Sequence, residues 1–70
     1  MNEKLAAIHW LLHLECPGRL VRYIHTRDFH SFRLEGAGPT HWVHLPRGLV
    51  VDLDADSLER LILHFINLYF

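Results

Sequence analysis

The chain has 70 residues, a formal net charge of −1 and a single cysteine. That length allows one domain at most, so residues 1–70 are expected to form a single domain. The small net charge excludes attachment to polyphosphates by bulk charge and acidic mimicry of DNA. Cys16 has no second cysteine to pair with, which excludes a disulfide within the chain and is typical of a reducing compartment.

The first predicted element is a helix over about residues 3–15. Asn2 is a suitable N-cap, and Glu3 in the first turn is favoured by the helix dipole. Apolar residues recur at helical spacing at Leu5, Ile8 and Leu12. Pro17 disfavours helical backbone at Cys16, so the helix is expected to end there. The apolar stretch is far shorter than the ~20 residues that cross a bilayer, so we expect a cytoplasmic protein with no membrane partner.

Residues 20–26 and 31–35 predict two antiparallel strands around a turn at 27–30. The expected pairs on their mostly apolar face are Tyr23 with Leu34 and His25 with Phe32. The opposite face is expected to pair Arg22 with Glu35 and Ile24 with Arg33. A slip of one residue would mix the two faces, so this register is preferred.

Residues 41–53 predict a second hairpin, with a turn at Pro46-Arg47-Gly48. The turn is expected to place Gly48 in the left-handed conformation, which glycine adopts without steric cost. The side chains that this register turns toward the core are His41, Val43, Leu45, Leu49, Val51 and Leu53. Those that it turns toward the opposite face are Trp42, His44, Val50 and Asp52.

The last predicted element is a helix that begins near Asp54 or Asp56 and runs to the C-terminus. Either aspartate is a suitable N-cap, and Glu59 follows Asp56 by three residues, as in a capping box. The stripe expected to face the core is Leu58, Leu61, Ile62, Phe65 and Tyr69. The elements predict an α+β fold in the order α-β-β-β-β-α. Both helices are expected to cover one face of the antiparallel meander and to leave the other face open.

The candidate residues for chemistry are histidines and the cysteine. His9 and His13 lie four residues apart on the predicted first helix, so both side chains lie on one side and could share a metal ion. The glutamate of a zinc-protease helix is absent, and a third ligand would have to come from another segment, with His64 as the candidate. The spacing of Cys16 to the histidines carries no signature of a thiol enzyme. No metal, cofactor or catalytic activity is therefore expected.

Two surfaces are candidates for association, because 50% of the residues are hydrophobic, more than a domain this small can cover. On the open face of the predicted sheet, the partner-binding residues are expected to be Trp42, Arg22, Ile24, Arg33, His44 and Val50. A second apolar stripe on the helices is expected to form a homodimer through Trp10, Leu14, Leu63, Ile66 and Phe70. The alternative is that this second stripe packs the two helices against each other.

The first function hypothesis is a non-catalytic module that binds a larger protein, as an inhibitor or regulator, by covering one of its surfaces. In size and fold class alone, the chain resembles small inhibitors carried by phages and mobile elements, anti-CRISPR proteins among them. The second hypothesis is a nucleic-acid-binding regulator, because arginines surround an aromatic ring on the open face. A metal protein or enzyme that uses His9, His13 and Cys16 ranks below both.

Overall fold

The elements of the structure follow one another in the order α-β-β-β-α-α. The computed structural model describes residues 2–36 and 38–69. The elements are α1 (Glu3–Glu15), β1 (Arg19–His25), β2 (Phe29–Gly36), β3 (His41–Pro46), α2 (Arg47–Asp52) and α3 (Ala55–Tyr69). The strands form one antiparallel sheet in the order β1-β2-β3. The α+β class is confirmed, whereas the predicted fourth strand is wrong.

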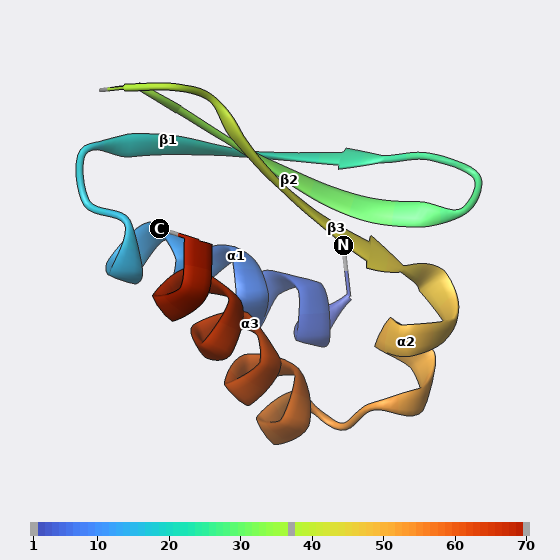
Figure 1. Ribbon diagram of the computed structural model, residues 1–70. Helices are drawn as coiled ribbons and strands as arrows, with labels where there is room; N and C mark the ends of the chain where they lie inside the picture. The colour runs from blue at the N-terminus through green and yellow to red at the C-terminus, as the bar shows by residue number, and fades with distance from the viewer. Residues whose placement is uncertain (1, 37, 70) are drawn as a thin grey trace.

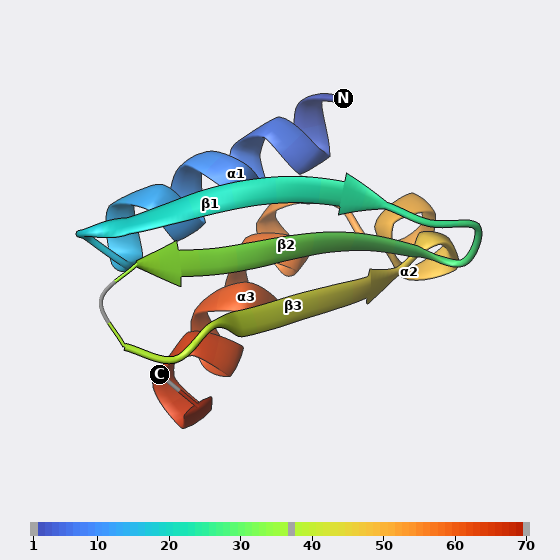
Figure 2. The same ribbon diagram turned by 90° about the horizontal axis from the view of Figure 1, so that it is seen from above.

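The described residues form two layers. Figure 1 shows the sheet as one layer and α1 and α3 as the other, with α2 beside the end of β3. The two long helices pack against each other beneath the strands. As predicted, both lie on the same side of the sheet, and within the described residues no helix covers the other side (Figure 2). We call this uncovered side the open sheet face.

The predicted first helix is confirmed as α1. The Asn2 side-chain oxygen accepts a hydrogen bond from the Leu5 amide at 2.9 Å and so caps the helix. The helix ends at Cys16, whose amide donates to the Leu12 carbonyl oxygen at 3.0 Å. The buried side of α1 consists of Leu5, Ile8 and Leu12. Local spacing and caps were therefore sufficient to place this element.

The register of β1 against β2 differs from the predicted one by two residues. Tyr23 lies opposite Phe32 rather than Leu34. The turn is tighter than predicted, because the Thr26 amide donates to the Phe29 carbonyl oxygen at 2.9 Å and β2 already begins at Phe29. Strand side chains alternate with a period of two, so a shift by two leaves each side chain on its predicted face.

The predicted second hairpin is wrong beyond Pro46. Residues Arg47–Asp52 form α2, and Gly48 does not have the positive φ that was predicted for it. Tertiary contacts explain this helical turn. The Arg47 amide donates to the Asp28 carbonyl oxygen at 3.1 Å, and Arg47 Nε donates to the carbonyl oxygens of Thr26 and Arg27, each at 3.0 Å. The start of α2 is thereby tied to the β1–β2 turn.

The helical conformation of α2 reverses the predicted placement of two valines. Val50 is 2% exposed and belongs to the core, whereas Val51 is 75% exposed. The Lys4 ammonium donates to the carbonyl oxygens of Val50 at 3.0 Å and of Leu53 at 2.7 Å. A cation at the last carbonyls of a helix is favoured by the helix dipole. The predicted position of Val50 on the open sheet face is therefore wrong.

α3 begins directly after Asp54, which acts as its cap. Asp54 Oδ1 accepts a hydrogen bond from the Ser57 amide at 2.7 Å. This bond, together with the Ser57 hydroxyl, holds the pKa of Asp54 below its ordinary value. The buried side of α3 consists of Leu58, Ile62 and Ile66. The second half of the predicted core stripe is wrong, because Phe65 and Tyr69 are exposed.

The core fills the space between the sheet and the helices. Its largest fully buried side chain is Phe32, on the central strand β2. The Tyr23 ring lies 5.4 Å from the Phe32 ring, measured between centroids. The other core side chains are Leu5, Ile8, Leu12, Val21, Leu34, Val43, Leu45, Val50, Leu58, Ile62 and Ile66. Every described element thus contributes to one core.

Replacing Gly48 by alanine tests the helical assignment of α2. A Cβ at Gly48 would stand in open space, so Gly48→Ala should raise the free energy of unfolding by about 0.5 kcal/mol through a smaller loss of backbone entropy. Gly36 is the matched control, because its φ is +126° and a Cβ would stand 2.9 Å from the Gly18 carbonyl oxygen. Gly36→Ala should lower the free energy of unfolding by about 1 kcal/mol or more. Urea denaturation measures both variants, and a loss of stability in Gly48→Ala would contradict the helix.

Candidate functional site

The open sheet face gathers side chains from all three strands. By strand alternation they are Leu20, Arg22, Ile24, Phe29, Ser31, Arg33, Glu35, Trp42 and His44. The register places Arg33 opposite Trp42 and Ser31 opposite His44. The structure brings together here most of the residues that were predicted for partner binding, namely Arg22, Ile24, Arg33, Trp42 and His44. Val50 is the exception, because α2 turns it into the core.

A stack of rings occupies the centre and one end of this face. The Trp42 and His44 rings are stacked, with 5.3 Å between centroids and 12° between planes. The Phe29 ring approaches His44 edge-on at 6.0 Å. Below them, the Ser31 hydroxyl lies 2.7 Å from His44 Nδ1. Ser31 is buried, so this hydrogen bond anchors the exposed imidazole to the sheet.

An apolar hollow of about 390 Å³ opens beside this stack. Its lining residues are Ile24, Thr26, Phe29, Ser31, Trp42 and His44. Trp42 is 40% exposed and Phe29 is 39% exposed, so both rings present large apolar surface to solvent. A hollow edged by exposed aromatic rings can receive an apolar side chain of a binding partner.

The other end of the open sheet face is charged. Glu35 forms ion pairs with Arg33 and with Arg22, whose Nε lies 3.3 Å from Glu35 Oε1. The predicted pairing of Arg22 with Glu35 is therefore present, although the two residues are not directly opposite in the register. The Arg33 guanidinium also lies 5.6 Å from the centroid of the Trp42 ring. A second hollow of about 440 Å³ is lined by Arg33, Glu35, Thr40 and Trp42. Trp42 thus contributes to both hollows.

Sequence reasoning missed Phe29, Ser31 and Thr26 as parts of this surface. Residues 27–30 were predicted to be a turn, which removed Phe29 from the strand. The missed signal is the alternation Phe29-x-Ser31-x-Arg33-x-Glu35, which continues the pattern of β2 backwards by one more pair. A pattern of period two identifies the shared face but not the length of the turn.

The residues predicted for self-association are dispersed in the structure. Trp10 is 63% exposed on α1, and Leu14 is exposed one turn further along. Leu63 is partly buried on α3. Ile66 is buried in the core, which makes its assignment to a subunit interface wrong, because the buried side of α3 continues through it. Phe70 lies outside the described residues.

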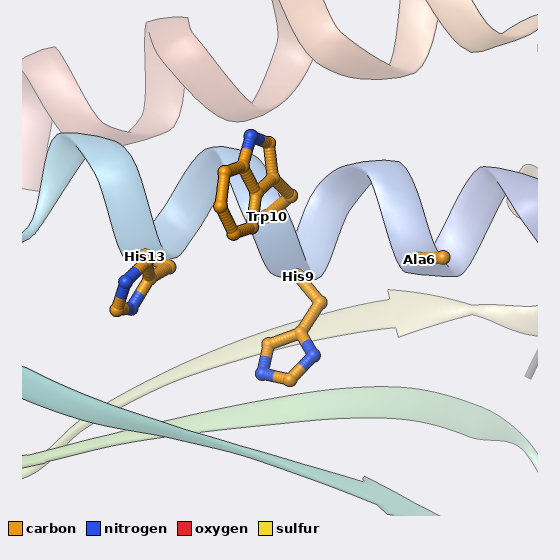
Figure 3. A pocket seen from close by; sticks show the side chains of 4 residues that line it. All are labelled: Ala6, His9, Trp10 and His13. Carbon is orange, nitrogen blue, oxygen red and sulfur yellow. The ribbon is translucent and has the colours of Figure 1, made fainter.

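The His9 and His13 pair lies beside a hollow of about 280 Å³, lined by Ala6, His9, Trp10 and His13. Figure 3 shows the His9 ring extending from α1 toward the strands. His9 Nε2 lies 3.0 Å from the Val21 carbonyl oxygen, and the His13 ring lies 5.7 Å from Trp10. In residues 2–36 and 38–69, no group of three or more histidine, cysteine or acidic side chains is placed to hold a metal ion. His9 therefore ties α1 to the outer strand β1.

Cys16 lies at the junction between α1 and β1. Burial raises the pKa of the Cys16 thiol, and this effect exceeds the opposing one of the nearby Arg19 guanidinium. A nucleophilic cysteine needs the reverse shift, because the thiolate is the reactive form. The geometry thus favours a structural role for this side chain.

Aromatic rings, hollows and most of the predicted partner-binding residues coincide on the open sheet face. Among the helices in the described part of the chain, none has the length and apolar character needed to cross a bilayer. Comparison with known protein families, curated proteins and solved structures found no match to this chain.

Proposed function

We propose that the chain is a non-catalytic module that binds a larger protein through its open sheet face. The observation that carries this proposal is Trp42, which is 40% exposed and adjoins both an apolar and a charged hollow. Tryptophan and arginine are the residues most enriched among interface hot spots. Arg33 and Trp42 lie opposite each other on neighbouring strands, so the two residue types are presented together.

The Trp42 ring is restrained before any partner arrives. It stacks on His44, and the Arg33 guanidinium lies over it. His44 is in turn anchored to Ser31. A side chain that is already ordered loses less conformational entropy on binding, so more of its burial energy contributes to affinity. The sheet thus supports a preorganised anchor.

A module of this kind acts as an inhibitor or regulator by keeping other ligands away from the surface that it covers. A specific interface buries about 800 Å² on each partner, which is about a sixth of the 4691 Å² of accessible surface here. One face of a two-layer domain can supply an area of this size. The proposal places the module in the cytoplasm, where an unpaired thiol such as Cys16 stays reduced.

Replacing Trp42 by alanine should reduce binding of the partner by about tenfold or more, because a buried hot-spot ring is lost. The thermal midpoint and the oligomeric state should not change, because Trp42 lies outside the core. Tagged protein is incubated with a lysate of the native host, and the captured proteins are quantified by mass spectrometry. Tyr69→Ala is the matched control, because Tyr69 is also an exposed aromatic residue but lies on α3 in the other layer.

Each other outcome contradicts a part of the proposal. Loss of capture in Tyr69→Ala but not in Trp42→Ala would move the binding surface to the helices. Unfolding of Trp42→Ala would make Trp42 a structural residue. Equal capture by both variants and the wild type would exclude the open sheet face as the binding surface.

A nucleic-acid-binding regulator is the second candidate function. The rings of Phe29, Trp42 and His44 favour it, because single-stranded bases stack on aromatic rings of a sheet, and Arg22 and Arg33 could contact phosphates. Fluorescence anisotropy with a labelled single-stranded oligonucleotide tests this function. Binding that weakens steeply between about 50 and 200 mM salt, and that Trp42→Ala abolishes, would support it over the protein-binding module. Absence of binding at low salt would exclude it.

Self-association through α1 is a separate proposal, carried by the exposed Trp10 and Leu14. Apolar side chains exposed one turn apart on a helix can pack against the same pair of a second copy. Sedimentation at micromolar concentration should then give a mass above the 8.3 kDa of one chain. Trp10→Glu should return the mass to that of a monomer. A monomeric wild type at the highest accessible concentration would show that these side chains form no dimer.

A further inference from the structure

The Arg47 side chain binds the β1–β2 turn from the side of the sheet that faces the helices. Its Nε donates to the carbonyl oxygens of Thr26 and Arg27, each at 3.0 Å, and its Nη2 donates to the Thr26 carbonyl oxygen at 2.6 Å. These charge-assisted bonds are stronger than bonds between neutral groups. The conformation of the turn therefore depends on the position of this guanidinium.

Two imidazoles flank the same guanidinium. His30 Nε2 lies 3.5 Å from Arg47 Nη1, and His25 Nδ1 lies 3.5 Å from Arg47 Nη2. A guanidinium only donates hydrogen bonds, so both of these ring nitrogens must be unprotonated acceptors. The observed arrangement consequently requires His30 to be neutral.

Tyr23 completes the arrangement around His30. The Tyr23 hydroxyl oxygen lies 2.7 Å from His30 Nδ1. Since Nε2 faces Arg47 as an acceptor, Nδ1 carries the proton of the neutral ring and donates it to Tyr23. The Tyr23 ring also stacks against His25 and His30, with centroids 6.0 and 5.9 Å apart. A second proton on His30 would therefore point directly at Arg47.

Other charged groups near His30 come from α1 and from the turn. Glu3 and Lys4 of α1 line a hollow together with His30, and the Lys4 ammonium is engaged by carbonyl oxygens at the end of α2. Arg27 and Asp28 are exposed in the turn. Burial, then the charge of Arg47, then that of His25 lower the pKa of His30 below its ordinary value of 6.5. Burial is thus the largest cause of this shift, and the charge of Arg47 acts in the same direction.

The turn that Arg47 holds also forms one wall of the apolar hollow. Thr26 and Phe29 both line that hollow. They are joined by a bond from the Thr26 amide to the Phe29 carbonyl oxygen at 2.9 Å, and by one from the Phe29 amide to Thr26 Oγ1 at 3.3 Å. Displacement of Arg47 on one side of the sheet would therefore reach the binding surface on the other side.

We propose that Arg47 and His30 form an acid-sensitive latch on the β1–β2 turn. Protonation of His30 replaces the acceptor Nε2 by a cation beside Arg47, expels the Arg47 guanidinium from the carbonyl oxygens of Thr26 and Arg27, and loosens residues 26–29. The consequence for partner binding, namely weaker binding in acid, rests on the proposed function. The latch itself is a property of the free chain.

The direction of the pH dependence follows from the lowered pKa of His30. As the pH falls, the open or unfolded turn binds a proton on His30 before the closed turn does. The stabilising contribution of the closed latch is therefore fully present above pH 6.5 and is lost as the pH falls through the ordinary and then the lowered pKa. The closed state is favoured at neutral pH.

Amide hydrogen exchange of the free chain at pH 7.5 and pH 5.5 tests the latch. After correction for the intrinsic exchange rate, the protection of the Thr26 amide should fall by about tenfold or more in acid. The Leu58 amide, which donates to the Asp54 carbonyl oxygen at 3.0 Å in α3, is the internal reference and should keep its protection. Unchanged protection of Thr26, or an equal loss at Leu58, would overturn the proposal, because the second result means global unfolding.

Variants assign the effect to the proposed groups. His30→Gln removes the titration of His30 but keeps an acceptor oxygen, so Thr26 should stay protected at both pH values. Arg47→Gln should leave Thr26 weakly protected at both. His64→Gln, at an exposed histidine of α3, should behave like the wild type. Acid-induced loss of protection in a folded His30→Gln variant would overturn the proposal. If that variant does not fold, the wild-type comparison of Thr26 with Leu58 still decides it. No partner is present in this experiment, so its failure would leave the proposed binding function unaffected.

Discussion

The hydrogen bonds from Arg47 to the β1–β2 turn organise much of this small fold. They engage the carbonyl oxygens of Thr26, Arg27 and Asp28, which a tight turn would otherwise leave to solvent. Because Arg47 directly follows Pro46, the same bonds determine where β3 ends and where α2 begins. A chain that continued as a fourth strand would have to give up the helical geometry that brings this guanidinium under the turn.

A second cation extends this arrangement to the N-terminal helix. Lys4 binds the carbonyl oxygens at the end of α2, while Arg47 binds the turn from its start. The N-terminal helix, α2 and the β1–β2 turn are thus linked through two cationic side chains and backbone carbonyl oxygens. Hydrogen bonds to charged donors are worth about 1.5–3 kcal/mol each, which matters in a domain whose whole stability is of the order of 5 kcal/mol.

The same arrangement leaves one face of the sheet without cover from the described residues. α1, α2 and α3 all lie on the other side or at the end of the strands (Figures 1 and 2). The uncovered face is nevertheless ordered, because Ser31 anchors His44 and His44 supports Trp42. Strands hold such side chains more rigidly than loops do, which suits a surface that binds without a large conformational change. The turn that closes one end of this surface is also the turn that Arg47 holds.

The sequence by itself determined the elements whose signals are local. The cap at Asn2 and the spacing of Leu5, Ile8 and Leu12 were sufficient for α1, and period-two alternation was sufficient to place Arg22, Ile24, Arg33, Trp42 and His44 on one face.

Tertiary structure decided the rest. The alternation of side chains does not show how long a turn is. The observed register of β1 against β2 therefore differs from the predicted one by two residues, and Phe29 lies on the open sheet face. Pro46-Arg47-Gly48 is equally compatible with a hairpin turn and a helix start, and bonds from Arg47 and Lys4 to residues far along the chain selected the helix. That selection moved Val50 from the open sheet face into the core, and the packing of α3 buried Ile66, because burial depends on neighbours that no local pattern specifies.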